Sequence, residues 1–286
     1  PLYCYNRETD ANEDKKPDYW TKQHSVRVRD RIPALNDVPE WYPEKRLPPT
    51  QRWRVMVGLG CDLQPGCLFC YYSHKKRVGF REWPDVEAEL RAGLKRGNRS
   101  VDFSGGEPTL IKDLPAWIGR TREIGLAPGI ITHGQRIEPM LDALWNAGLD
   151  DILFSVHGDE DDHNRLTRTE AGFGKLWRAM TKCAEQGFAF RTNTVLVDNF
   201  KGLPALAKKL TRIKPLISNF INFQASWEWA DKSEGEMPFQ VRVSEVAPYL
   251  REAIDILTSA GTCVNVRYFP FCLLKGYEPH VCKEFQ

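Results

Sequence analysis

From residue 53 onward, short apolar runs alternate with longer segments in which apolar residues recur every three or four positions. Short runs of this kind are typical of buried strands, and the longer periodic segments are typical of amphipathic helices. The predicted strands are residues 53–59, 99–103, 127–132, 151–156, 188–196, 218–224 and 264–269. The predicted helices are residues 84–96, 112–124, 137–147, 173–186, 202–212 and 244–260. The pattern therefore predicts a series of strand–helix units.

A glycine closes five of the predicted helices, just before the next strand. These glycines are Gly97, Gly125, Gly148, Gly187 and Gly261. Glycine readily adopts the left-handed backbone conformation that ends a helix. Repeated helix–glycine–strand punctuation favours strands that all run in one direction, joined by helical crossovers. We therefore expect an α/β fold, a partial (β/α)6 barrel of the TIM type.

The first part of the chain has a different pattern. Residues 1–50 carry mixed charges and several prolines, and no helical or strand period persists there. We expect residues 1–50 to form an extended N-terminal arm, with an unstructured tail as the alternative. Residues 51–262 are the predicted barrel, and residues 263–286 are a predicted short C-terminal extension of it.

Composition narrows the range of partners. The chain has 286 residues, 42% of them hydrophobic and 27% charged, which is ordinary for a globular protein of one large domain or two small ones. Its net charge of +2 gives no electrostatic argument for a nucleic-acid or membrane partner. No apolar stretch approaches the roughly 20 residues of a membrane span, and no signal-peptide layout is found near the start.

Three of the eight cysteines stand within ten residues: Cys61, Cys67 and Cys70. Disulfide frameworks are expected in small exported chains, so this trio points first to metal ligation. A zinc ion normally takes four Cys or His ligands, and His74 is near enough to supply the fourth. An iron–sulfur cluster with three protein ligands would instead keep one iron free for a small molecule. Both interpretations, and a loop without metal, stay open on the spacing alone.

Polar clusters lie at the ends of the second, third and fourth predicted strands, at Ser104–Pro108, Thr132–Gly134 and Ser155–Gly158. Active sites of βα barrels lie at the carboxyl ends of the strands, so we expect these clusters to meet at one edge. The catalytic residues themselves are unknown. His133 and His157 are candidates for a general base or a substrate contact, with a hydrogen-bonded wall position as the alternative. Cys272, after a Phe-Pro-Phe stretch, is a candidate hydrogen-atom donor or a packing residue.

A cysteine trio ending in Cys-x-aromatic-Cys after the first strand, followed by Gly-Gly-Glu-Pro after the second, resembles the radical S-adenosylmethionine (SAM) superfamily. The resemblance spans roughly residues 53–270. One feature departs from it, since five residues separate the first two cysteines where the superfamily usually has three. The subfamily therefore stays unidentified.

The resemblance implies an enzyme that reductively cleaves SAM at a [4Fe–4S] cluster held by Cys61, Cys67 and Cys70. The resulting 5′-deoxyadenosyl radical would abstract hydrogen from a small-molecule or nucleotide substrate. The alternatives are a peptide- or nucleic-acid-modifying radical SAM enzyme and, from another class, a zinc-stabilised binding module. The implied partner is a low-potential electron donor of the flavodoxin or ferredoxin type. An oxygen-sensitive cluster also implies a cytoplasmic location.

The SAM-binding residues implied by the resemblance come from several strand ends. Glu107 and nearby carbonyls would accept hydrogen bonds from the SAM ammonium, and Arg168, on the following helix, would clamp its carboxylate. Asn193 would contact the ribose. Some members have an alternative role: Phe69 and Tyr71 border adenine or pack under the loop, and Arg168 is otherwise a solvated arginine. The full predicted set is Phe69, Tyr71, Ser104, Gly105, Gly106, Glu107, Thr132, Ser155, Arg168 and Asn193.

Overall fold

The computed structural model of the chain describes residues 52–70, 79–224 and 239–281. The predicted N-terminal arm, Tyr71 and His74 lie outside these residues. Seven strands form one sheet in the order of the sequence, and every neighbouring pair is parallel. They are β1 (Arg52–Met56), β2 (Ser100–Ser104), β3 (Ala127–Thr132), β4 (Asp151–Ser155), β5 (Phe190–Leu196), β6 (Ile217–Asn222) and β7 (Cys263–Arg267).

The helices fall between the strands as the periodicity predicts. They are α2 (Trp83–Lys95), α3 (Leu114–Ile124), α4 (Leu141–Asn146), α5 (Glu160–Thr167), α6 (Gly172–Glu185), α7 (Leu203–Leu210) and α8 (Val243–Ser259). Short 3-10 turns are η7 (Pro108–Leu110), η8 (Glu138–Met140), η9 (Phe200–Gly202), η11 (Phe271–Leu274) and η12 (Glu278–His280). Two predicted helices, 137–147 and 202–212, each divide into a 3-10 turn followed by a shorter α-helix.

The helix ends confirm the glycine punctuation. All five predicted glycines have positive φ angles between 70° and 97°. The helix that was not predicted as a separate element is α5. Its N-cap is Asp159, whose side chain accepts a hydrogen bond from the Asp162 backbone N–H at 3.2 Å. The acidic run at 159–162 therefore caps and begins a helix, as expected for carboxylates at a helix N-terminus.

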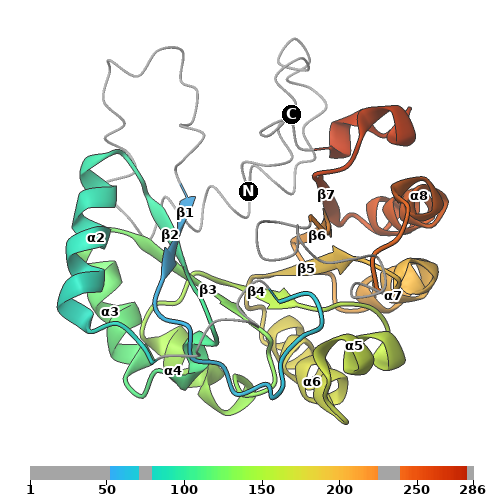
Figure 1. Cartoon of the computed structure of the whole chain (residues 1–286). Coiled ribbons are helices and arrows are strands. Elements are labelled where there is room, and N and C mark those ends of the chain that lie inside the picture. Colours follow the sequence, from blue (N-terminus) through green and yellow to red (C-terminus); the bar gives the residue numbers. More distant parts are fainter. Residues whose placement is uncertain (1–51, 71–78, 225–238, 282–286) are drawn as a thin grey trace, which may run out of the picture.

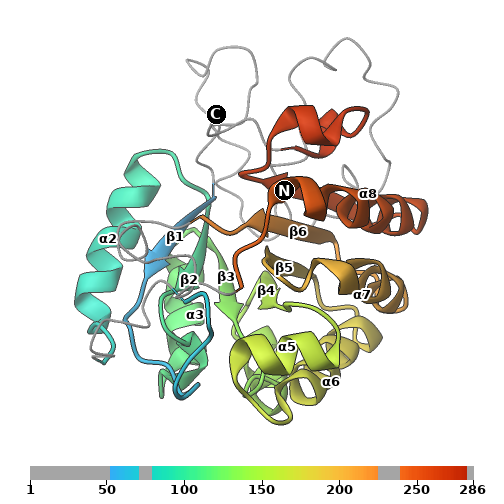
Figure 2. The same ribbon diagram turned by 45° about the vertical axis from the view of Figure 1, so that its right-hand side comes forward.

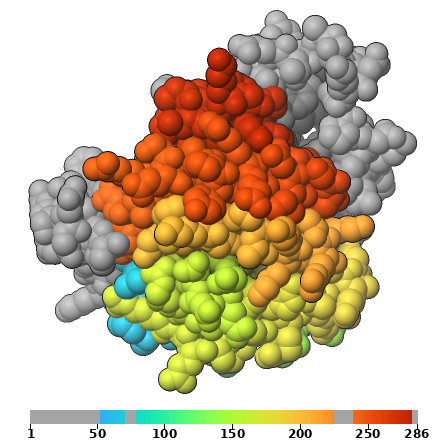
Figure 3. All heavy atoms as spheres, turned by 90° about the vertical axis from the view of Figure 1, so that its right-hand side faces the viewer, coloured from blue at the N-terminus to red at the C-terminus, as the bar shows by residue number. Residues whose placement is uncertain are grey.

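The sheet curls into an open barrel with its helices on the outside. Figures 1 and 2 show α2 to α8 arranged around the convex face of the strands, with β1 and β7 at the two free edges. Figure 3 shows the outer face on the α8 side, where α8 (orange) lies beside the yellow and green surface of the preceding elements. The prediction of a partial barrel is confirmed, with a seventh strand in the same sheet.

The main core fills the space between the convex face of the sheet and these helices. Helix α6 illustrates why the chain folds this way, because Phe173, Leu176, Met180 and Cys183 recur at helical spacing and are all buried. Such a stripe favours a helix packed on a sheet. The predicted C-terminal extension begins with β7, which pairs with β6, and continues in η11 and η12.

A buried ion network crosses the concave side of the sheet near the beginning of the strands. Arg52 pairs with Asp102 at 2.7 Å and with Asp151, and Arg191 pairs with Asp102 at 2.9 Å and with Asp151 at 2.9 Å. Burial by itself would lower the pKa of Arg52, but the two carboxylates outweigh this effect and raise it. The network thereby links four strands, β1, β2, β4 and β5, on the side of the sheet away from the carboxyl ends of the strands.

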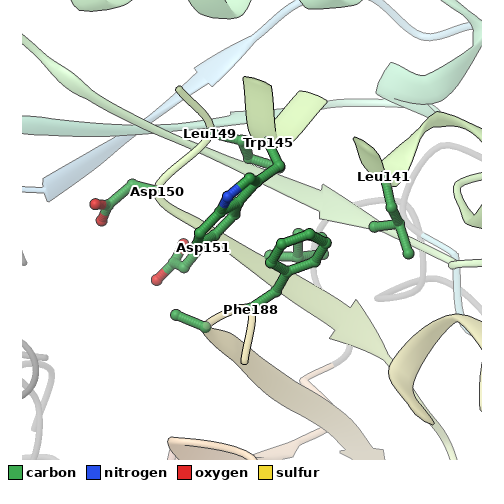
Figure 4. A pocket seen from close by; sticks show the side chains of 8 residues that line it. Leu141, Trp145, Leu149, Asp150, Asp151 and Phe188 are labelled. Atoms are coloured by element: carbon green, nitrogen blue, oxygen red, sulfur yellow. The ribbon is translucent and has the colours of Figure 1, made fainter. Parts of the chain in front are cut away.

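A small pocket lies at the same end of the barrel. Figure 4 shows Trp145 and Phe188 beside Asp150 and Asp151, at the start of β4. The two aromatic rings stack with centroids 4.1 Å apart. Since Ser155 ends β4 and Asp151 begins it, this pocket lies at the opposite end of the strand from the predicted site. None of the helices in the described part of the chain has the length and apolar character needed to cross a bilayer.

Candidate functional site

The cysteine loop, residues 61–70, follows β1 and lies beside the end of β2. Cys61, Cys67 and Cys70 form no disulfide, and each is partly exposed. In the described part of the chain, the Cys61 sulfur lies within 4.8 Å of an Asp62 carboxylate oxygen and of a His133 ring nitrogen. Thiolate, carboxylate and imidazole groups are all metal ligands in proteins, so this arrangement agrees with metal ligation at the loop.

The second half of the cysteine loop is anchored to the β4–α5 region. The Leu68 N–H donates to the Leu166 carbonyl at 2.9 Å. Phe69 is buried in a small apolar cluster with Leu166, Val197, Phe223 and Phe239. Its ring also lies edge-on to His157, with centroids 4.7 Å apart. Phe69 thus packs under the loop, which is one of its two predicted roles.

The Gly-Gly-Glu-Pro turn, residues 105–108, is hydrogen-bonded to the backbone before the cysteines. The Gly106 N–H donates to the Gly58 carbonyl at 2.9 Å, and the Glu107 N–H donates to the Gly60 carbonyl at 2.7 Å. A Cβ atom on Gly105 would clash with the Gly58 carbonyl oxygen, and one on Gly106 with that of Gly60. The paired glycines are therefore needed for close contact between two loops of the protein, in addition to any approach to a ligand.

The carboxylate of Glu107 has protein partners on both oxygens. Oε1 accepts from Thr109 N–H at 3.0 Å, from Thr109 Oγ1 at 2.7 Å and from Thr132 Oγ1 at 2.7 Å, while Oε2 accepts from His133 N–H at 2.9 Å. The residue is fully buried. These hydrogen bonds fasten the turn to β3. That Glu107 also accepts a hydrogen bond from the SAM ammonium stays a prediction.

His133 lies between two carboxylates. Its Nε2 is 2.9 Å from Asp62 Oδ1 and 3.3 Å from Glu107 Oε2. Burial by itself would lower the pKa of His133, but the charges of Glu107 and Asp62 and the hydrogen bond to Asp62 raise it. The same hydrogen bond lowers the pKa of Asp62. His133 therefore joins the end of β3 to the cysteine loop.

His157 occupies the wall position that was the alternative to catalysis. It is 4% exposed, and its Nδ1 accepts a hydrogen bond from the Val195 N–H at 3.3 Å. Burial, and then the neighbouring His163, lower its pKa well below the usual range. The rings of His157 and His163 stack with centroids 5.8 Å apart. Its burial and its hydrogen bond to the backbone agree with the wall alternative, and a catalytic role of His157 stays a prediction.

The remaining predicted residues lie in three regions. Ser155 ends β4 and is in register with Asn193 of β5, so these two side chains lie next to each other on the concave face. Arg168 is exposed at the C-cap of α5, the helix that follows β4, with a φ of 56°. Cys272 is exposed in η11, beyond the carboxyl end of β7.

Comparison with known proteins gives one family match. The model of the radical SAM superfamily matches residues 55–210, which is more than half of the chain. The chain belongs to the radical SAM superfamily. The predictions of that family, of its barrel and of its cofactors, a [4Fe–4S] cluster and SAM, are therefore confirmed at the level of the family. The residues that hold them stay predictions.

Individual radical SAM relatives match part of the chain. PqqA peptide cyclase from Xanthomonas oryzae pv. oryzae is 44% identical over 149 residues, covering 50% of this chain and 38% of the relative. GTP 3′,8-cyclase from Aquifex aeolicus is 27% identical over 160 residues, covering 53% and 49%. SuiB from Streptococcus suis, solved with SAM bound, has a TM-score of 0.63 at 18% identity, covering 76% and 49%. The chain thus spans about half or less of the length of these proteins.

Sequence reasoning missed a polar row on the concave wall. Asn193, Asn219 and Asn265 are in register on β5, β6 and β7. Asn219 Nδ2 donates to the Thr192 carbonyl at 2.9 Å, and Asn265 Nδ2 donates to Asn219 Oδ1 at 3.1 Å. Asparagine is uncommon inside strands, so its recurrence in the last three was the available signal. Asp62 carried no such signal, because an acid in a loop is ordinary.

Proposed function

We propose that this chain cleaves SAM reductively at a [4Fe–4S] cluster and directs the resulting radical to a hydrogen atom of a bound substrate. One observation carries the proposal: the loop that holds the three cysteines adjoins the Gly-Gly-Glu-Pro turn. Backbone hydrogen bonds of 2.9 Å and 2.7 Å join that turn to the residues just before Cys61. A place for the cluster and a place for its ligand are thereby built as one unit.

The donor set fits an iron–sulfur cluster. Cys61, Cys67 and Cys70 supply three soft thiolate ligands from one loop, the ligand type that iron–sulfur clusters take. Three protein ligands leave a fourth position for the amino and carboxylate groups of SAM. When bound, the cluster and SAM together would supply a 5′-deoxyadenosyl radical, the oxidant for an unactivated C–H bond.

The chain's own residues position and shield these groups. Glu107 fastens the turn to β3, and Glu107 and neighbouring carbonyls are proposed to accept hydrogen bonds from the SAM ammonium. Ser155 and Asn193, adjacent in register, are proposed to contact the carboxylate and ribose. Phe69 and its apolar cluster lie under the loop and exclude water from that side.

For the substrate we propose a small molecule or nucleotide that binds against the concave wall. The similarity to GTP 3′,8-cyclase supports a nucleotide. A second candidate is a peptide, supported by the 44% identity to PqqA peptide cyclase over half of the chain. The asparagine row offers both donors and acceptors on neutral side chains, and it suits either class.

The reaction needs one electron at low potential for each cleavage. We propose a flavodoxin- or ferredoxin-type protein as the donor and the reducing cytoplasm as the compartment, because the cluster is oxygen-sensitive. Two assays separate the substrate candidates, one with nucleoside triphosphates and one with short synthetic peptides. The true substrate class is expected to raise the release of 5′-deoxyadenosine above the rate without substrate.

Iron and sulfide counting tests the proposal. Anaerobically reconstituted protein is expected to hold about four irons per chain and to release 5′-deoxyadenosine and methionine with a strong reductant. A Cys61→Ala/Cys67→Ala/Cys70→Ala triple variant is expected to hold none, whereas Cys272→Ala, which removes an exposed thiol outside the loop, retains the iron. Stoichiometric zinc in the wild-type protein would establish the rival zinc-stabilised module. About four irons remaining in the triple variant would reveal a second cluster.

A further inference from the structure

The first half of the cysteine loop has its own anchor, formed by the residue that follows Cys61. Asp62 Oδ1 lies 2.9 Å from His133 Nε2, and Oδ2 lies 3.3 Å from Arg136 Nη1. These partners are 71 and 74 positions away in the sequence. These two contacts therefore fasten the segment between Cys61 and Cys67 to the residues that follow β3.

The imidazole of His133, which contacts Asp62, is itself fixed in orientation. The Gln135 N–H donates to His133 Nδ1 at 3.1 Å, so the ring proton is on Nε2 and points toward Asp62. The His133 N–H donates to Glu107 Oε2 at 2.9 Å. The ring is only 8% exposed. A continuous chain of contacts thus runs from the Gly-Gly-Glu-Pro turn through His133 and Asp62 to the backbone of Cys61.

This chain of contacts ends beside a sulfur atom. The Cys61 sulfur, an Asp62 carboxylate oxygen and a His133 ring nitrogen all lie within 4.8 Å of one another. Charged and hydrogen-bonding groups at that distance from a ligand sulfur set the reduction potential of an iron–sulfur cluster. They also restrict the freedom of the thiol before any iron is bound.

We propose that Asp62 and His133 are positioning residues: they hold Cys61 in place for the cluster and couple it to the turn that receives SAM. The proposal rests on the proposed function for its cluster, but it also makes a statement about the chain without iron. Asp62 belongs to the segment that is two residues longer than is usual in this superfamily. Added loop residues add conformational freedom. The contacts of Asp62 with His133 and Arg136, which together form the Asp62 clamp, restrict that freedom.

The test uses Asp62→Ala and the isosteric Asp62→Asn, with Asp161→Asn as a charge-matched control. Asp161 is an exposed acid in the first turn of α5. Asp62 is about one-third exposed and outside every helix and strand, so its variants are expected to fold. Alkylation of each cysteine in the iron-free protein is followed by mass spectrometry. The midpoint potential of the reconstituted cluster is followed by a redox titration.

In Asp62→Ala, Cys61 is expected to be alkylated several-fold faster than in the wild-type protein, while Cys67 and Cys70 keep their rates. The midpoint potential is expected to shift to a less negative value, because a negative charge near the cluster is removed. Asp62→Asn keeps one acceptor for His133, so Cys61 should retain most of its protection from alkylation. Its midpoint potential should shift in the same direction as in Asp62→Ala. Asp161→Asn should change neither quantity. An unchanged Cys61 rate or an unchanged potential in Asp62→Ala overturns the proposal. A wild-type protein without an iron–sulfur cluster would contradict the proposed function, and the alkylation rates alone would then decide the clamp.

Discussion

At the scale of single residues, the site separates groups that face a ligand from groups that hold other residues. Glu107 and His133 have their polar atoms engaged by the protein. The Gly105 and Gly106 backbone is packed against the residues before Cys61. Ser155 and Asn193 are partly exposed and adjacent. The motif that suggests SAM binding is therefore first a device for joining β2, β3 and the cysteine loop.

This assignment predicts a stability effect for Glu107. Glu107→Ala leaves four buried donors without their acceptor, and it should lower the free energy of unfolding by about 2–4 kcal/mol. Weaker SAM binding would follow from the loosened turn. Chemical denaturation of the iron-free protein measures the effect. Glu123→Ala, at an exposed position of α3, is the control and should stay within about 0.5 kcal/mol. Equal stabilities of the two variants would show that Glu107 does not fasten the turn.

At the scale of elements, β3 is the strand that contacts both the Gly-Gly-Glu-Pro turn and the buried ion network. Its end supplies Thr132 and precedes His133, and its middle carries Gly129, which faces the buried ion network. A Cβ atom there would lie within 2.7 Å of Arg52 Nη2, Asp102 Oδ1 and Asp151 Oδ1. The network occupies the space that a side chain on β3 would need, so glycine is required at this strand position.

Two Gly→Ala substitutions should therefore have opposite effects. Gly129→Ala should destabilise the fold by about 3–5 kcal/mol, since it displaces one partner of a buried ion pair. Gly119→Ala, in the interior of α3 with its nearest neighbour 4.0 Å from the added carbon, should stabilise the fold by about 0.5–1 kcal/mol. Thermal or urea unfolding of both variants provides the comparison. A tolerated Gly129→Ala would mean that the network rearranges at little cost.

At the scale of the whole molecule, folding buries imidazoles as well as ion pairs. Burial, with a smaller contribution from the charge of His133, lowers the pKa of His163 to about 4. Its Nδ1 accepts the His157 N–H at 3.2 Å. A histidine with a pKa that is depressed in the folded state takes up its proton in the unfolded chain first. Stability is therefore present above the unfolded value of about 6.5 and falls as the pH approaches 4.

The free energy of unfolding should thus decrease between pH 6.5 and pH 4.5, with His163 contributing up to about 1.4 kcal/mol per pH unit. His163→Asn keeps an acceptor for the His157 N–H and removes the titrating group. The variant should show a shallower dependence over this range than the wild-type protein, by denaturation at several pH values. Parallel curves for the two proteins would refute the assignment of the slope to His163.

The sequence by itself determined the order and boundaries of most elements, because apolar periodicity and helix-ending glycines are local properties. It also placed the cysteine loop and the Gly-Gly-Glu-Pro turn at adjacent strand ends, since parallel strands present their carboxyl ends at one edge. Only the tertiary structure decided which partners these residues have. Arg52 and Asp151 are 99 positions apart, Asp62 and His133 are 71 apart, and Thr132 and Glu107 are 25 apart. Such pairs depend on the curvature and register of the sheet, which no local pattern encodes. For that reason the sequence predicted a ligand contact for Glu107 but not its hydrogen bonds to the end of β3, and it gave no signal for the contact of Asp62 with His133.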